Sequence, residues 1–151
     1  MNLEHWCWFA LAACALHIVE EFVLDWRGWI KSITGIEVSR TLFWTMNSLL
    51  LALGVACASV ATRWPAVALA IPALMLINAT IFHVGVCIWL RGRFSPGLIT
   101  ALLLFYPIAF GCYRSASQSG VLTGPVWAGS LLLGALAMFA PMLFLRIVFR
   151  R

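Results

Sequence analysis

Apolar residues fill five long stretches of the chain, and short polar segments separate them. The stretches cover residues 6–24, 41–62, 66–90, 97–113 and 125–149. A transmembrane helix needs about 20 mostly apolar residues to cross the hydrocarbon core of a bilayer. The pattern therefore predicts an all-α integral membrane bundle of five transmembrane helices, which forms a single domain over residues 1–151.

The polar segment 25–40 has a helical pattern of its own. Its apolar residues recur at helical spacing and form one stripe: Trp26, Trp29, Ile30 and Ile33. An amphipathic helix of this kind lies in the membrane interface, with its apolar side among the lipid head groups. We therefore expect a short interfacial helix after the first span.

Two local signals add detail to the later spans. Gly54 and Ala58 have the small-xxx-small spacing that lets two membrane helices approach closely, so we expect the second span to pack tightly. Ser95 and Pro96 precede the fourth span. We expect Ser95 to cap that helix and Pro96 to occupy its first turn.

Composition agrees with the membrane class. Of 151 residues, 64% are hydrophobic and only 10% are charged, whereas a soluble domain is about 25% charged. The net charge of +5 does not indicate nucleic-acid binding, because the basic residues stand one to three at a time between the spans. The five cysteines are odd in number and scattered, so we expect reduced packing residues and no disulfide framework.

The basic residues predict the orientation, because Lys and Arg concentrate on the cytoplasmic side of membrane proteins. With five spans, eight fall on one side: Arg27, Lys31, Arg40, Arg91, Arg93, Arg146, Arg150 and Arg151. Only Arg63 and Arg114 fall on the other side. We therefore expect the amino terminus outside and the carboxyl terminus in the cytoplasm, with the bacterial inner membrane as the location.

The first apolar stretch carries three ionisable residues that a membrane span rarely holds. His17, Glu20 and Glu21 are spaced so that they project from one face of a helix. An ionised carboxylate at the centre of a span costs about 2.5 to 3.5 kcal/mol, so such residues usually mark a functional site or a buried pair. Two neighbouring carboxylates also repel each other. A metal ion, a protonated partner or a bound cation in transit would relieve that repulsion.

Other polar residues of the spans fall near the same depth. With a rise of about 1.5 Å per residue, we expect His17, His83 and Asn47 about 10 to 12 Å below the cytoplasmic interface. The two glutamates lie about one turn shallower, and Asn78 lies about a turn and a half deeper. The strongly polar side chains thus gather in the cytoplasmic half of the first three spans.

This set predicts a divalent metal site, with zinc or iron as the first candidates, because imidazole and carboxylate ligands suit both. The predicted ligands are His17, Glu20, Glu21 and His83, with Glu20 and Glu21 also as catalytic acid or base, and Asn47 and Asn78 as supporting polar residues. A structural interpretation is open for the same residues, since a His–Glu pair and two asparagines can simply order helix packing. Arg91 and Arg93 are weaker candidates for binding a substrate head group, because positive residues there also serve as anchors.

Three motifs follow one another along the chain. Residues 17–21 read HIVEE, residues 78–83 read NATIFH, and residues 91–97 read RGRFSPG. Together they resemble the HXXEE-motif family of small multi-span bacterial membrane proteins. The resemblance implies the same architecture and the same site residues, although the function of that family is not established. Phe94 stands where we expect a tyrosine in the third motif, which argues against a tyrosyl hydroxyl at that position.

The leading functional hypothesis is a membrane-embedded enzyme. It would use a metal, or a Glu/His acid-base pair, to act on a lipid or other hydrophobic small molecule that enters from the cytoplasmic leaflet. The same cluster also fits an ion or proton relay, or an accessory subunit with a structural polar core, so enzyme activity is open at this point. The chain shows no obvious inverted repeat of the kind found in transporters. Membrane lipids are the expected partners, nucleic acid is not, and self-association stays open.

Overall fold

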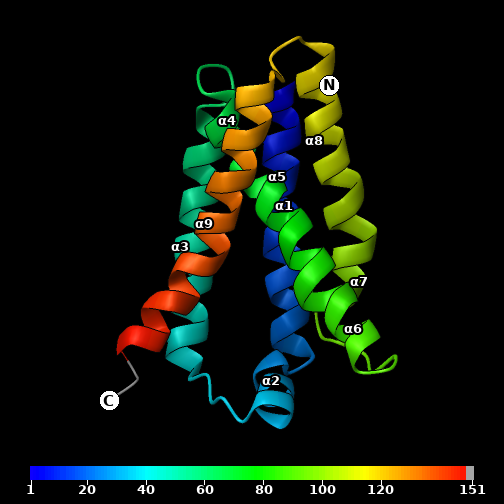
Figure 1. Cartoon of the computed structure of the whole chain (residues 1–151), viewed down its shortest axis with the longest axis vertical. Helices are drawn as coiled ribbons and strands as arrows, with labels where there is room; N and C mark the ends of the chain where they lie inside the picture. Colours follow the sequence, from blue (N-terminus) through cyan, green and yellow to red (C-terminus); the bar gives the residue numbers. More distant parts are fainter. Residues whose placement is uncertain (149–151) are drawn as a thin grey trace.

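Helices make up most of the described chain. The computed structural model describes residues 1–148, and within that range it contains helices and short connections but no strand. In the last helix, side chains are described up to Pro141 and at Leu143. Five helical segments are long and apolar enough to cross a membrane, which confirms the predicted five-span bundle (Figure 1).

Three spans are continuous helices, and two are built from several pieces. The continuous ones are α1 (Leu3–Val23), α3 (Arg40–Ser59) and α9 (Gly124–Val148). The third span comprises α4 (Pro65–Ala68), α5 (Ala70–Ile77), η1 (Asn78–Gly85) and α6 (Val86–Trp89). The fourth comprises α7 (Leu98–Thr100), η2 (Ala101–Phe105) and α8 (Tyr106–Gln118), and thus continues past its expected end at residue 113. The pieces η1 and η2 are π-helical, and the sequence pattern did not predict them.

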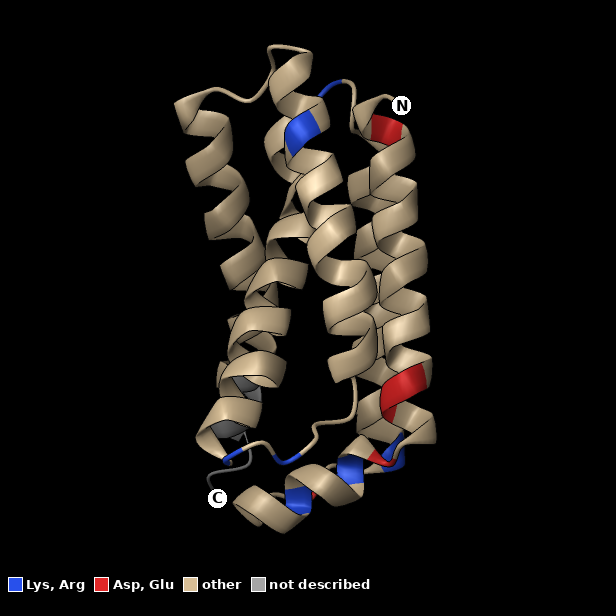
Figure 2. Ribbon diagram, turned by 90° about the vertical axis from the view of Figure 1, so that its right-hand side faces the viewer, with Lys and Arg blue, Asp and Glu red and all other residues tan. Residues whose placement is uncertain are grey.

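The expected interfacial helix is α2 (Trp26–Thr34). It lies across one end of the bundle, directly after α1 (Figure 2). We call this end of the molecule the α2 end. Most of the described basic residues gather there (Figure 2). Of the residues used to predict orientation, Arg150 and Arg151 and the side chain of Arg146 lie outside the described part of the chain.

The helices differ in how their first N–H groups are satisfied. Asn2, Asp25 and Ser39 cap α1, α2 and α3 from the position directly before each helix. The fourth span has no such cap of its own: it begins after Gly97, which has a φ of 94°. The expectation that Ser95 caps this helix is therefore wrong, because the Ser95 hydroxyl contacts a histidine of the third span instead.

The spans pack around α1 and α5. α3 and α8 lie against α1, while α9 lies against α4 and α5. Gly54 and Ala58 are buried, and a Cβ at Gly54 would stand 2.7 Å from Leu11 Cδ1, so the predicted close approach of α3 is present. All five cysteines are free thiols, and four of them are buried.

Candidate metal centre

His17, Glu21 and His83 meet inside the bundle near the α2 end. Each residue offers one ligand atom, and the three atoms lie within 4.8 Å of one another. Glu21 Oε1 is 3.6 Å from His17 Nε2 and 3.8 Å from His83 Nε2. The two rings are nearly perpendicular, with centroids 4.8 Å apart. The first and third spans therefore bring two imidazoles and one carboxylate to a common point, as the sequence spacing predicts.

The two imidazoles are deeply buried, and each turns the same atom toward Glu21. His17 is 5% exposed and His83 is 1% exposed. Within the described residues, Nε2 of each ring has no hydrogen-bond partner. A buried polar atom without a partner is costly, because it has lost its contacts with water and gained none from the protein. Both atoms thus face a point where a further group is needed.

The opposite nitrogen of His17 is held by the fourth span. His17 Nδ1 lies 2.8 Å from Thr100 Oγ1, and the same hydroxyl lies 2.6 Å from Glu20 Oε2. A hydroxyl has one proton, and the shorter contact to the carboxylate takes it. The Thr100 oxygen is then left to accept a hydrogen bond from Nδ1–H. In that tautomer the Nε2 lone pair of His17 points at Glu21.

His83 is held in a similar way by the loop before the fourth span. Its Nδ1 lies 3.1 Å from Ser95 Oγ, and the Ser95 hydroxyl has a carbonyl acceptor in Pro96 O at 3.4 Å. This arrangement lets Ser95 accept from Nδ1–H and leaves the Nε2 lone pair free. Partners of this kind fix the tautomer and orientation of metal-binding histidines.

Glu20 faces the fourth span and lies outside the three-residue group. Its carboxylate accepts hydrogen bonds from the N–H groups of Gly97, Ile99 and Thr100 at 2.7 to 3.1 Å, and from the Thr100 hydroxyl. These are the first N–H groups of a helix that lacks its own cap, and the positive end of a helix dipole favours a carboxylate there. The structure therefore separates the two adjacent glutamates, which the sequence treats as one pair.

Gly97 lies against both imidazoles. A Cβ at this position would stand 2.5 Å from His83 Cε1 and 2.7 Å from His17 Cε1. Its φ of 94° is also a conformation that other residues rarely adopt. Glycine is thus required here for two reasons, the backbone turn and the close approach of the two rings.

Both π-helical segments border this group. His83 belongs to η1. Phe105 is the last residue of η2, and its ring centroid lies 4.4 Å from the ring centroid of His17. A π-helical turn widens the helix and shifts the residues after it around the axis, and such turns are frequent at functional sites. In this chain they determine where the His83 imidazole stands relative to His17.

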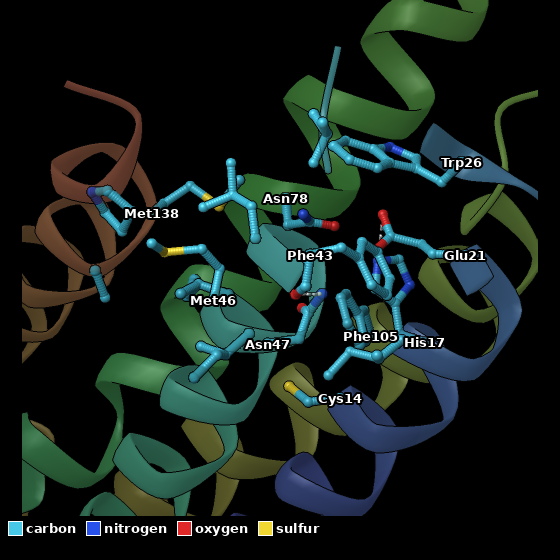
Figure 3. Close-up of a pocket in the computed structure, with 17 residues that line it drawn as sticks. Cys14, His17, Glu21, Trp26, Phe43, Met46, Asn47, Asn78, Phe105 and Met138 are labelled. Atoms are coloured by element: carbon cyan, nitrogen blue, oxygen red, sulfur yellow. Dashed lines mark hydrogen bonds and ion pairs between the residues drawn. The ribbon is translucent and has the colours of Figure 1, made fainter. Parts of the chain in front are cut away.

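A cavity of about 240 Å³ begins at His17 and Glu21. Its lining is mostly apolar and comes from α1, α2, α3, α5, η1, η2 and α9. Figure 3 shows His17 and Glu21 at one end, and Met46 of α3 and Met138 of α9 at the other. The cavity therefore has one polar end and one apolar end.

The two asparagines predicted near the cluster line this cavity (Figure 3). Asn47 donates from Nδ2 to Phe43 O of its own helix at 3.0 Å. Asn78 Oδ1 is buried and has no partner among the described residues. Neither asparagine belongs to the three-residue group. They are polar points on the cavity wall, beside the cluster.

The two arginines predicted to bind a head group are placed elsewhere. Arg93 donates from Nη2 to Ser32 Oγ of α2 at 3.1 Å, and both Arg91 and Arg93 are exposed in the loop after α6. Neither lines the cavity that begins at Glu21.

The donor set fits a transition metal. Two imidazole nitrogens and one carboxylate oxygen form a known ligand set for catalytic zinc and for non-haem iron. Two ligand atoms that each lie about 2.1 Å from one ion are at most about 4.2 Å apart. A small inward rotation of the side chains would therefore bring all three ligand atoms within reach of one ion. Three protein ligands leave further coordination positions for a water or a substrate oxygen.

Sequence reasoning missed Thr100, Ser95 and Gly97 as parts of the site. Ser95 and Gly97 lie inside the third motif, RGRFSPG, and that motif was the available signal for them. Thr100 is one threonine in an apolar stretch, with no pattern that marks it. Its role follows only from the way the fourth span meets α1.

Comparison with protein families gives one match. Residues 8–112 match a family model described as a protein of unknown function with HXXEE motif. The matched segment includes His17, Glu20, Glu21, His83 and the loop with Gly97. Searches of the curated proteins and of the solved structures find no match to this chain.

Proposed function

The chain belongs to this HXXEE-motif family, and we propose that it is a membrane-embedded, metal-dependent enzyme that acts on a lipid or another hydrophobic molecule. His17, Glu21 and His83 hold the ion, with zinc or iron as the metal. One observation supports this proposal above the others. Two deeply buried imidazoles, each oriented from behind by a hydroxyl, turn unpartnered Nε2 atoms toward the same carboxylate oxygen.

The residues around the ion have different proposed roles. A bound divalent metal supplies a Lewis acid at the polar end of the cavity. Glu21 Oε1 lies 3.6 Å from His17 Nε2 and 3.8 Å from His83 Nε2, so this oxygen would hold the metal, and the other would serve as acid or base toward the substrate. Glu20 is a positioning residue, because its contact with the Thr100 hydroxyl orients His17.

The cavity supports a hydrophobic substrate. Met46, Leu50 and Met138 line it, and all three are partly exposed. Met46 and Leu50 come from α3, and Met138 comes from α9. An apolar chain in this space would displace water from apolar surface, which favours binding at about 25 cal/mol per Å². The substrate would enter from the membrane between α3 and α9.

We also propose that the α2 end faces the cytoplasm. Lys and Arg gather at this end, and fewer lie at the other (Figure 2). Arg27, Lys31, Arg40, Arg91 and Arg93 lie in α2, at the start of α3 and in the loop after α6, while Arg63 precedes α4 and Arg114 lies in α8. The positive-inside bias supports an amino terminus on the outside, and we propose the inner membrane of a bacterium as the location. Reporter fusions at each terminus measure this orientation.

Metal analysis of the purified protein tests the central claim. Protein in a mild detergent should contain about one zinc or iron per chain, and His17→Ala, His83→Ala and Glu21→Gln should each remove it. His5→Ala is the matched control, because His5 is exposed near the amino terminus and its ring forms a hydrogen bond with Asn2, away from the site. Metal that persists in both His17→Ala and His83→Ala would refute the site.

A lipid assay then tests the enzymatic part. Membrane lipids incubated with the metal-loaded protein should show a mass change that is absent with His83→Ala. The alternatives give different results. A metal-free protein that moves protons or ions across vesicles would be a relay, and histidine variants that lose assembly without any metal change would indicate a structural core.

A further inference from the structure

Glu21 stands between two cavities. The larger one, of about 240 Å³, runs toward Met46 and Met138, and a smaller one, of about 120 Å³, lies on the other side. Both are lined by Glu21, Trp26 and Phe43, so the two cavities share these side chains as a wall. The smaller cavity is bounded by the end of α1, the start of α2 and the start of α3, at the end of the bundle where the chain leaves the membrane.

The smaller cavity is lined by two basic and two acidic side chains. Arg27 and Arg40 line it together with Asp25 and Glu21. The Asp25 carboxylate accepts a hydrogen bond from Gly28 N at 3.2 Å and caps α2. With Glu21 counted, the lining holds two guanidinium and two carboxyl groups, so its formal charge is zero, and the two guanidinium groups are its only basic side chains.

Both arginines have guanidinium N–H groups without a hydrogen-bond partner among the described residues. Arg27 uses Nε to donate to Val38 O at 2.7 Å, which fixes its stem and leaves its terminal nitrogens free. Among the described side chains, neither arginine takes part in an ion pair, and Arg40 makes no side-chain hydrogen bond. Guanidinium groups with free terminal nitrogens bind phosphate and carboxylate oxygens through paired hydrogen bonds.

We propose that the substrate is a single-chain amphiphile with a phosphate head group, and that Arg27 and Arg40 bind the phosphate. This inference rests on the proposed function and names its substrate class. The phosphate occupies the smaller cavity, the neighbouring carbons pass Glu21 and His17, and the apolar chain fills the larger cavity. A phosphate monoester carries close to two negative charges and three acceptor oxygens, which matches two guanidinium groups better than a carboxylate does.

The size of the larger cavity agrees with an apolar chain. A dry cavity of about 150 Å³ is enough to bind benzene. The larger cavity exceeds this volume and is lined mostly by apolar side chains, so it has room for several methylene groups. Flexible thioether side chains at its far end, Met46 and Met138, adapt to chains of different shape.

The simpler role of basic residues at this depth is to anchor the helix ends, and the structure separates the two roles. Arg91 and Arg93 line neither cavity and suit an anchor. Arg27 and Arg40 converge on a cavity that joins the proposed metal centre. An anchor requires no such convergence, so variants of the two pairs should behave differently.

Calorimetric titration of metal-stripped protein in a nonionic detergent tests the proposal with three probes: dodecyl phosphate, dodecanol and inorganic phosphate. Dodecyl phosphate should bind at least about tenfold more tightly than either other probe, since each lacks one half of the recognised structure. Arg27→Gln and Arg40→Gln should each lower the affinity for dodecyl phosphate at least about tenfold. Arg91→Gln is the matched control and should leave the affinity within about twofold.

A second variant covers the case in which an arginine variant misfolds. Met46→Trp fills the larger cavity and leaves both arginines in place. It should therefore lower the affinity for dodecyl phosphate to near that for inorganic phosphate. Equal binding by wild type, Arg27→Gln and Arg40→Gln would overturn the proposal. Inorganic phosphate that binds as tightly as dodecyl phosphate would overturn the amphiphile and indicate a free phosphate site. Because the titration uses metal-free protein, its failure leaves the metal result standing, and the reverse also holds.

Discussion

Replacing Gly97 by alanine is the sharpest single test of how the site is built. Gly97 touches both imidazoles and lies outside the proposed ligand set. A Cβ at this position would stand 2.5 Å from His83 Cε1, whereas ordinary van der Waals contact begins near 3.4 Å. One or both rings must therefore move, by about 0.9 Å in total if the backbone stays in place.

The size of the effect follows from two costs. A left-handed conformation costs an alanine about 1 to 2 kcal/mol of stability relative to glycine. The ring movement is a separate cost, because metal-ligand distances tolerate only about 0.2 Å of error. Outer-shell changes of this kind lower metal affinity about 10- to 100-fold, and we expect a loss in that range for Gly97→Ala.

Gly92→Ala is the matched control for this experiment. Gly92 has a φ of 89°, and a Cβ there would meet nothing within 4 Å. The control therefore carries the backbone strain of Gly97→Ala without the ring displacement. Zinc affinity is measured by competition with a chromophoric chelator in detergent, and stability by thermal unfolding. Both variants should lose similar stability, while only Gly97→Ala should lose zinc affinity.

The reasoning is refuted if Gly97→Ala keeps wild-type zinc affinity. It is also refuted if Gly92→Ala loses as much affinity as Gly97→Ala, because strain alone would then explain the result. In the first case the rings do not face the proposed ion position. In the second case the loop as a whole, and not the contact with the two imidazoles, controls binding.

Three further predictions concern the residues that support the site and the bundle. Thr100→Val removes the hydroxyl between Glu20 and His17 and should lower zinc affinity about tenfold, while Thr100→Ser should restore it, as chelator competition can show. Glu20→Gln should lower the free energy of unfolding by about 1 to 3 kcal/mol, because the Glu20 carboxylate satisfies helix N–H groups. The variant should keep one metal per chain, and loss of all metal in elemental analysis would contradict this prediction. Gly134→Ala should destabilise the bundle by about 1 to 3 kcal/mol in thermal unfolding, because its Cβ would stand 2.8 Å from the backbone of α5; Gly124→Ala, which meets nothing within 4 Å, should not.

The sequence by itself determined the helical bundle and the depth of the site within the membrane. Apolar stretches of about 20 residues require membrane helices, because backbone polar groups in lipid must be satisfied within the helix. The spacing of His17 and Glu21 places both on one face of α1, and the distance of His83 from the end of its span places it at a similar depth. These relations are local, so they can be read along one helix at a time.

Only the tertiary structure decided which glutamate joins the histidines. Successive residues on a helix point about 100° apart, so Glu20 and Glu21 can share one broad face of α1 and still contact different neighbours. The structure places the start of the fourth span beside Glu20 and His83 beside Glu21. Which span lies on which side of α1 depends on how all five helices pack, and the π-helical turns of η1 and η2 then set the final position of the rings. No pattern within a single helix contains that information, because it arises from contacts between residues as far apart as Glu20 and Thr100.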